Sequence, residues 1–181
     1  GMDYLYKSAR LGHPEAFNKL GIFHLSGVHV NKNIAEAIKQ FEIAVKYQLP
    51  SAMYNLAQIF LNGEESYRDI ERAISLLKES SDLDYNISQR ALADLYFKGE
   101  AITQNYNFAF ELYKTLANKG DFYSQNQLGI MYFEGLGVDV NYEKAKEWFR
   151  KAKKNGSNEA VLNLKKYFYL NNLFENNKNK E

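Results

Sequence analysis

Histidine is the side chain best suited to acid and base chemistry near neutral pH, and this chain of 181 residues has three histidines. They are His13, His24 and His29, and their spacing does not match the His-x-His or His-Glu-x-x-His patterns that place zinc ligands on one helix. Cysteine is absent, which excludes a thiol nucleophile, a disulfide framework and every thiolate metal site. The sequence therefore predicts no metal centre.

Other catalytic patterns are missing as well. The chain has no Gly-x-Ser-x-Gly elbow and no P-loop, and the pair Gly135 and Gly137 belongs to a turn that the sequence repeats. The adjacent acids Glu64 and Glu65 lie in another such turn, where we interpret them as solvated. We therefore predict that the protein is not an enzyme and binds no cofactor.

A step of 36 residues relates the recurring residues of the chain, and it identifies the elements that must position any binding site. Four runs of apolar and aromatic residues each end in a glycine, and no insertion or deletion interrupts the four copies. Self-similarity at such a period predicts an array of small structural units that stack on one another. The main series are Gly27, Gly63, Gly99 and Gly135; Leu20, Leu56, Leu92 and Leu128; Gly21, Ala57, Ala93 and Gly129; Ala37, Ala73, Ala109 and Ala145; and Phe41, Leu77, Tyr113 and Phe149.

Each copy predicts two helices. Pro14 and Pro50 occupy first-turn positions of the first helix, where proline is tolerated, and the glycine that follows this helix supplies the positive φ of a helix end. The second helix begins after a side chain that accepts a hydrogen bond from its free N–H groups. The expected N-cap residues are Asn33, Asp69, Asn105 and Asn141, and the expected ends of the second helices are Gln48, Asp84, Gly120 and Gly156.

The fourth copy carries the fullest pattern, SQNQLGIMYFEGLGVDVNYEKAKEWFRKAKKNG at residues 124–156. Its LG..Y..G.GV, KA..W..KA and closing glycine resemble the Sel1-like repeat family, a relative of the tetratricopeptide repeat. The resemblance implies an all-α fold, a TPR-like right-handed superhelix of antiparallel helix pairs, with the first helices on the concave face and the second helices on the convex face. The second turn glycine remains only at Gly137, and we expect local differences in the turns that carry His29, Glu65 and Ala101 instead.

The repeats predict one solenoid domain over residues 1–170 and a polar, disordered tail over residues 171–181. The domain is expected to hold four full copies, a partial copy before them and a terminal helix after them. Their expected bounds are 13–48, 49–84, 85–120 and 121–156 for the full copies, 2–12 for the partial copy and 157–170 for the helix.

The positions of the first helices that the repeat core does not use differ from copy to copy, as an interaction surface should. Side-chain amides are frequent among them, and an amide offers a donor and an acceptor to the backbone of an extended peptide. The resemblance implies an adaptor or scaffold that binds a protein or peptide on its concave face. The residues that we expect to contact this partner are Asn55, Gln58, Arg90, Asp94, Tyr123 and Gln127.

Two alternatives remain open, an RNA-binding helical-repeat protein and a regulatory subunit of an enzyme. The basic and acidic residues of the predicted face balance, so we expect no nucleic acid as a partner. The residues that balance are Lys19, Arg90 and Lys98 on one side and Glu15, Asp94 and Glu134 on the other.

The chain has 23 Lys and Arg and 22 Asp and Glu, which leave a net charge of +1. This net charge does not favour binding to phosphate backbones or to anionic membranes. The opening residues lack the apolar run of a signal peptide, and no stretch approaches the roughly 18 apolar residues of a membrane span. We therefore expect a cytoplasmic protein that binds no membrane. The second helix of the fourth copy ends with Lys151, Lys153 and Lys154, which we interpret as cations that complement the helix dipole. We interpret Trp148 of the same helix as a core residue.

Overall fold

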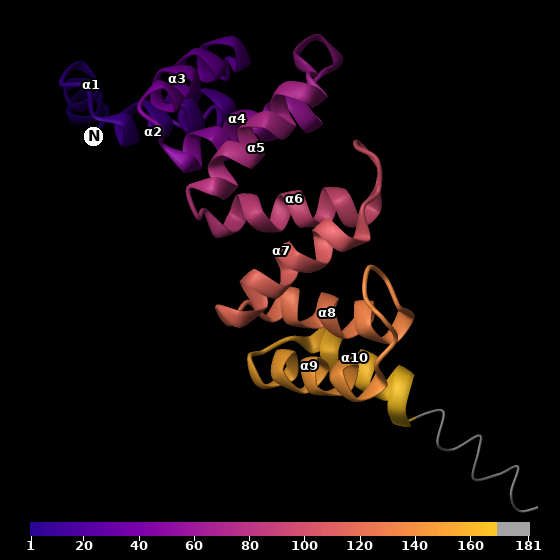
Figure 1. Ribbon diagram of the computed structural model, residues 1–181. Helices are drawn as coiled ribbons and strands as arrows, with labels where there is room; N and C mark the ends of the chain where they lie inside the picture. The colour runs from indigo at the N-terminus through magenta and orange to yellow at the C-terminus, as the bar shows by residue number, and fades with distance from the viewer. Residues whose placement is uncertain (170–181) are drawn as a thin grey trace, which may run out of the picture. The chain divides into compact units, whose positions relative to one another are not determined.

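The structure is a computed structural model that describes residues 1–169, and every regular element in that range is a helix (Figure 1). Their bounds are α1 Met2–Arg10, α2 Pro14–Ser26, α3 Ile34–Lys46, α4 Pro50–Asn62, η1 Glu65–Tyr67, α5 Ile70–Asp82, α6 Asn86–Lys98, α7 Tyr106–Asn118, α8 Phe122–Glu134, α9 Tyr142–Lys154, α10 Asn158–Leu164 and the π-helical η2 Lys165–Tyr169. The predicted tail over 171–181 lies outside the described residues.

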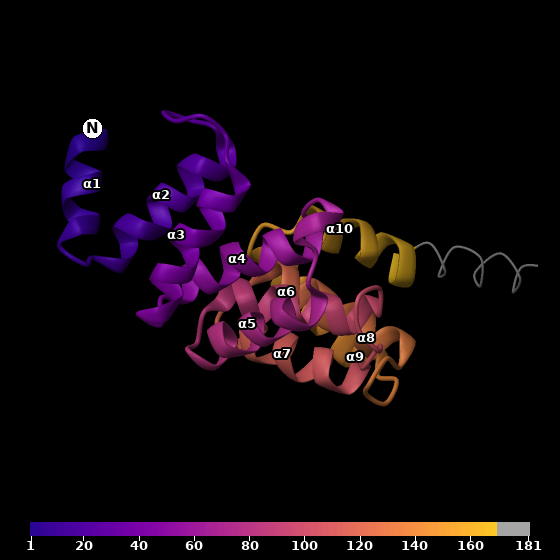
Figure 2. The same ribbon diagram turned by 90° about the horizontal axis from the view of Figure 1, so that it is seen from above.

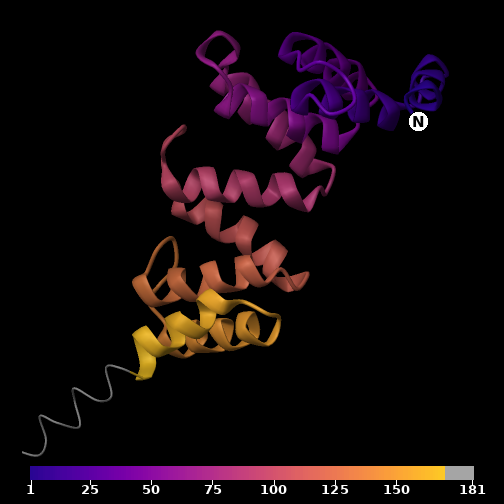
Figure 3. The same ribbon diagram turned by 180° about the vertical axis from the view of Figure 1, so that it is seen from behind.

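The helices follow the predicted repeat. Each full copy holds two α-helices of 13 residues, which we call helix A and helix B: α2 and α3, α4 and α5, α6 and α7, α8 and α9. α1 is the helix B of the partial copy and packs beside α2 (Figure 2), while α10 is a further helix A that packs beside α9 (Figure 3). The prediction of an all-α array of TPR-like helix pairs is confirmed.

The predicted helix starts are also confirmed. Pro14 and Pro50 are the first residues of α2 and α4, where a missing N–H costs no helical hydrogen bond. All four predicted N-caps accept a bond from the backbone N–H three residues later, at N···O distances of 2.9 to 3.0 Å. These caps are Asn33, Asp69, Asn105 and Asn141.

Three of the four glycines at the ends of helices A have the expected positive φ, namely Gly27, Gly99 and Gly135. The prediction is wrong for Gly63, whose φ of −72° and ψ of 177° are extended. The turn of this copy contains the 3-10 helix Glu65–Tyr67, which begins at the position where His29 and Gly137 are left-handed, with φ values of 66° and 68°. Gly63 still has no room for a side chain, since a Cβ there would lie 2.3 Å from the Ile59 carbonyl oxygen.

The helices B end two residues earlier than predicted, at Lys46, Asp82, Asn118 and Lys154. The four predicted end positions are instead left-handed residues of the turn that follows, with φ values of 56° at Gln48, 60° at Asp84, 96° at Gly120 and 101° at Gly156. A left-handed residue just after a helix is a common way to stop it. The predicted terminal helix is likewise shorter in its α-helical part, because the chain changes to π-helical geometry at Lys165.

Helix A and helix B of one copy approach closely where a glycine meets an aromatic ring. A Cβ on Gly21 would lie 2.6 Å from the Phe41 ring, and a Cβ on Gly129 would lie 2.5 Å from the Phe149 ring. Both rings are fully buried, so they have little room to move away. The corresponding positions of the middle copies hold Ala57 with Leu77 and Ala93 with Tyr113.

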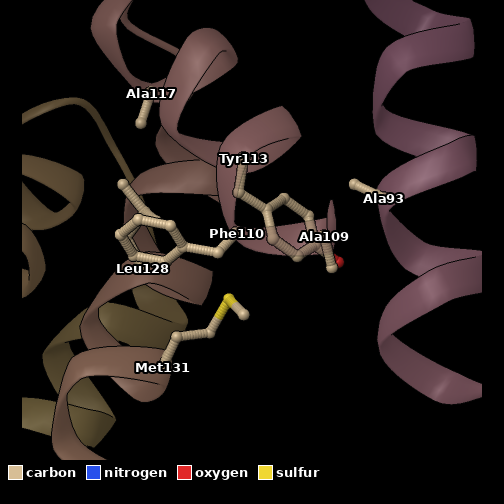
Figure 4. Packing of buried hydrophobic residues seen from close by; sticks show 7 residues of the cluster. All are labelled: Ala93, Ala109, Phe110, Tyr113, Ala117, Leu128 and Met131. Carbon is tan, nitrogen blue, oxygen red and sulfur yellow. The ribbon is translucent and has the colours of Figure 1, made fainter. Parts of the chain in front are cut away.

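The chain forms two compact units, residues 1–92 and the residues from Ala93 onward, divided within α6. In the second unit, Tyr113 of α7 points toward the helix that carries Ala93, and Phe110 lies near Leu128 and Met131 of α8 (Figure 4). A second cluster of this unit surrounds Phe149. The first unit has buried residues of its own, among them Leu20 and Leu56, so each unit has a buried core on which its helices A and B are fixed.

Candidate interaction surface

Helices A of successive copies contact each other through polar side chains. In the first unit, the Asn55 amide of α4 donates to Asn18 Oδ1 of α2 at 2.9 Å, and the Asn18 amide donates to Ser51 Oγ at 3.2 Å. Asn18, Ser51 and Asn55 are all half-buried. We use the name helix-A surface for the half-buried side chains of helices A that lie at these contacts or one turn away from them. Its residues include Asn55, Gln58, Arg90, Asp94, Tyr123 and Gln127.

The second unit repeats the amide pair three copies later. The Asn163 amide of α10 donates to Asn126 Oδ1 of α8 at 2.9 Å, and Asn126 is 2% exposed. In both pairs the two residues lie 37 positions apart, one more than the repeat length. Each pair therefore joins two different positions of successive copies rather than the same position twice.

A carboxylate takes the place of the amide pair between α6 and α8. Asp94 Oδ1 accepts the Tyr113 hydroxyl at 2.5 Å and the Tyr123 hydroxyl at 3.0 Å. The Gln127 side chain also hydrogen-bonds to the Tyr113 hydroxyl. Three of the predicted binding residues, Asp94, Tyr123 and Gln127, thus gather around one buried hydroxyl.

Burial and the neighbouring Asp94 charge raise the pKa of Tyr113 and of Tyr123 above the ordinary tyrosine value of 10.0. The charge of Glu159 on α10 adds to this effect at Tyr123. Both hydroxyls therefore stay protonated at neutral pH and donate to Asp94. A protonated phenol held as a donor is suited to positioning a carboxylate and not to acting as a base.

The other predicted binding residues belong to the first unit. Asn55 and Gln58 lie one turn apart on α4, and Gln58 Oε1 accepts the Asn62 amide at 2.9 Å. Arg90 is half-buried on α6, one turn before Asp94. All six predicted residues are half-buried, which leaves part of each side chain accessible to a partner.

Sequence reasoning missed the polar role of Tyr113 and the packing of Tyr123 against the core. The repeat series placed Tyr113 among the core aromatics, and its ring is indeed fully buried, but its hydroxyl is the centre of the polar cluster. The Tyr123 ring packs against the core of the second unit, with its centroid 6.3 Å from that of Tyr113. Tyr123 is therefore partly a core residue, and its removal would disturb the fold as well as the surface.

Among residues 1–169, no three His, Asp or Glu side chains come together in a way that could hold a metal ion. In the same range, no helix has the length and the apolar character needed to cross a membrane. The cytoplasmic location stays a prediction.

Comparison with solved structures places the chain beside other helical repeat proteins. A protective antigen of uropathogenic Escherichia coli with an SLR fold superposes on 94% of this chain with a TM-score of 0.87 and 29% identity. A Sel1 repeat protein from Oxalobacter formigenes also covers 94% of the chain, with a TM-score of 0.83 and 24% identity. Cysteine-rich protein B of Helicobacter pylori covers 68% of the chain, with a TM-score of 0.51 and 22% identity, and shows a likeness of fold alone.

The lengths of these proteins differ from that of this chain. The matched part is 36% of the E. coli protein, so the chain spans about a third of that protein's length, and it is 69% of the O. formigenes protein and 94% of the H. pylori protein. No curated protein matches the sequence. The profile of the Sel1 repeat matches residues 14–46, 50–85, 86–121 and 122–157, which together make up most of the chain. The chain belongs to the Sel1 repeat family.

Proposed function

We propose that this Sel1 repeat protein is a protein-interaction module that binds a peptide or an extended segment of a protein partner on its helix-A surface. The observation that carries the proposal is the pair of amides formed between successive helices A, Asn55 with Asn18 and Asn163 with Asn126. These bonds fix the side-chain amides in place before a partner binds. Fixed polar groups lose less conformational entropy on binding than free ones do.

Asn55 keeps hydrogen-bonding capacity for a partner. Its Nδ2 uses one of two N–H groups on Asn18, and it is half-buried rather than enclosed. The remaining N–H and the carbonyl oxygen match the carbonyl and N–H groups of an extended peptide backbone. Gln58, one turn further along α4, offers a second amide at the spacing of a helical turn.

The second unit supplies a different preference. Asp94 and Glu159 bring negative charge to the helix-A surface near Tyr123. A basic side chain of the partner would therefore be favoured there, with the exposed part of the Tyr123 ring as apolar contact area. Gln127 would contribute a further amide beside it.

We propose binding without catalysis. The raised pKa of Tyr113 and of Tyr123 keeps both hydroxyls protonated, so that neither serves as a nucleophile or a base at neutral pH. No observation on the helix-A surface favours RNA, because its basic and acidic residues balance. Regulation of an enzyme by such binding is one way in which the proposed module could act.

The test begins with short random peptides displayed on phage and selected on the full chain. The dissociation constant of a selected peptide is then measured by fluorescence anisotropy for the native chain and for the double variant Asn55→Ala with Gln58→Ala. We expect the dissociation constant to rise at least about tenfold, which corresponds to roughly 1.4 kcal/mol. Circular dichroism checks that the helicity is unchanged.

The matched control is Lys78→Ala with Lys39→Ala, two exposed side chains on helices B. This variant should change the dissociation constant by less than about twofold. Loss of binding in the control, with binding retained in the helix-A variant, would show that the partner uses helices B. Failure to select any peptide would count against the module itself.

A further inference from the structure

Two surface pockets lie at the same position of the repeat, one in each unit. The pocket of the second unit encloses about 310 Å³ and that of the first unit about 260 Å³. All five lining residues of the first-unit pocket correspond, at a shift of two repeat lengths, to residues that line the second-unit pocket, so the repeat fold itself forms the pocket. The corresponding residues, first unit and then second unit, are Gln48 and Gly120, Met53 and Gln125, Glu79 and Lys151, Asp82 and Lys154, and Leu83 and Asn155.

The two pockets carry opposite charge. Glu79 and Asp82 line the pocket of the first unit near the end of α5, whereas Lys151 and Lys154 line that of the second unit near the end of α9. The same two positions hold Ile43 and Lys46 in the first copy and Thr115 and Asn118 in the third. Both positions are therefore acidic in the second copy and both are basic in the fourth copy.

The helix dipole does not account for this pattern. The last turn of a helix favours cations, yet α5 ends with two acids at the positions where α9 has two lysines. The sequence suggested that Lys151 and Lys154 complement the dipole of α9. The same reasoning cannot explain why α5 of the second copy has acids at these two positions. The charge of each pocket therefore needs an explanation in the pocket itself, such as a ligand of the opposite charge.

The pocket of the second unit has a fixed polar floor. Gln125 is 4% exposed, and its amide donates to the Ala117 carbonyl oxygen at 3.0 Å while its Oε1 accepts the Asn155 amide at 2.9 Å. These bonds orient Asn155, which keeps its carbonyl oxygen and one N–H for a ligand. Met53 at the corresponding place of the first unit gives no such floor.

One wall of the pocket is formed by Trp148, the single tryptophan of the chain. The Lys151 Nζ lies 4.1 Å from the centroid of the indole ring, a cation–π contact that holds the ammonium group over this ring. Lys154 follows one turn later on the same helix. Trp148 packs against the core of the second unit, as the sequence predicted, and it also positions the Lys151 charge at the surface.

We infer that this pocket is a second binding site, one that takes an acidic side chain from a segment of a protein partner. Its carboxylate would lie between Lys151 and Lys154, and Asn155 would hydrogen-bond to the neighbouring backbone amide. The pocket volume suits one or two side chains and their backbone, not a folded element. The site goes beyond the proposed helix-A function, because the residues that would contact its ligand, Lys151, Lys154 and Asn155, lie on α9 or directly after it and not on a helix A.

A peptide carboxylate fits the pocket better than a nucleic acid does. The Lys151 ammonium group covers a face of the Trp148 ring, which is then closed to a stacking base. Two lysines can neutralise few phosphates, so counterion release would add little affinity. The charge of the site is thus matched to a short acidic segment.

The experiment uses end-blocked, dye-labelled hexaglutamate and the full chain. Fluorescence anisotropy should show saturable binding with a dissociation constant on the order of 100 µM at low salt, weakening toward 150 mM salt. Unlabelled hexaglutamate should change the emission of Trp148 over the same concentration range, which locates the site. In the double variant Lys151→Gln with Lys154→Gln the dissociation constant should rise at least about tenfold.

The matched control is Arg150→Gln with Lys153→Gln, which removes the same charge from exposed positions of α9 that do not line the pocket. This variant should bind hexaglutamate within about twofold of the native chain, and so should Asn55→Ala with Gln58→Ala, so that the two proposed sites can fail separately. Equal losses in both α9 variants, or no saturable binding, would overturn the site. Tighter binding of hexauridylate, or an equal response to inorganic phosphate, would overturn a peptide as its ligand.

Discussion

In the first and fourth copies, helix A meets helix B through a glycine against a ring, as with Gly129 and Phe149, whereas helices A of successive copies meet through polar pairs such as Asn126 with Asn163. The first contact is steric and permits one arrangement, since a single added carbon would overlap a buried ring. The second contact is made by hydrogen bonds, and different combinations of polar side chains can form them. It is an amide pair in two places and a carboxylate with two tyrosines in a third. The contacts between helices A therefore vary in their chemistry, whereas the contact between helices A and B varies in the sizes of the two side chains that pack together, as in Ala57 with Leu77.

The largest effect is expected at the contact between helices A and B. Gly129→Ala places a Cβ against the buried Phe149 ring and should lower the free energy of unfolding by about 3 kcal/mol. Urea denaturation followed by circular dichroism measures this loss. The double variant Gly129→Ala with Phe149→Leu reproduces the Ala57 and Leu77 combination of the second copy, so it should be more stable than the sum of the two single effects predicts. Strict additivity would show that the two positions do not form a size-matched pair.

A smaller loss is expected when the charged contact between helices A is removed. Asp94→Ala leaves the buried Tyr113 hydroxyl without its acceptor and should cost about 2 kcal/mol. The same change in a Tyr113→Phe background should cost much less, because that hydroxyl is then absent. The double-mutant cycle, again by urea denaturation, isolates the coupling. A coupling near zero would mean that the hydrogen bond between Asp94 and Tyr113 adds nothing to stability.

The raised pKa of Tyr113 makes stability depend on alkaline pH. Below pH 10 the side chain is protonated in both states, but above pH 10 it ionises in the unfolded chain while the folded chain keeps the proton. The free energy of unfolding should therefore fall as the pH rises above 10, by up to about 1.4 kcal/mol per pH unit for this one group. Tyr113→Phe should make the fall less steep. Tyr4→Phe, at a tyrosine that is 81% exposed, is the control and should leave the slope unchanged.

The same comparison explains how far the sequence could lead. The glycine, alanine and leucine series, the helix starts and the caps at Asn33 and its equivalents repeat at a constant step, so residue type and spacing were sufficient to predict them. The prediction failed at Gly63 because the turn that follows it, although of the same length, has a different conformation that includes the 3-10 helix Glu65–Tyr67. The helix-A contacts join residues 37 apart, out of phase with the repeat, and the Asp94 cluster draws a hydroxyl from a helix B. Such partners depend on side-chain positions in three dimensions, which no series of one residue type reveals.

The smallest effects are expected at the two amide pairs, and they should differ from each other. Asn126 is 2% exposed, so Asn126→Ala leaves the Asn163 amide without a partner near buried surface and should cost about 1.5 kcal/mol. Asn55 is half-buried, and water can replace its bond to Asn18, so Asn55→Ala should cost about 0.5 kcal/mol. Urea denaturation of both variants measures the difference. If Asn55→Ala proved as costly as Asn126→Ala, Asn55 would be held for stability, and its availability to a peptide would be lost from the proposed surface. If Asn55→Ala lowers the free energy of unfolding only slightly but weakens peptide binding, the fold does not require Asn55. Its amide would then serve the partner rather than stability, as the proposed surface requires.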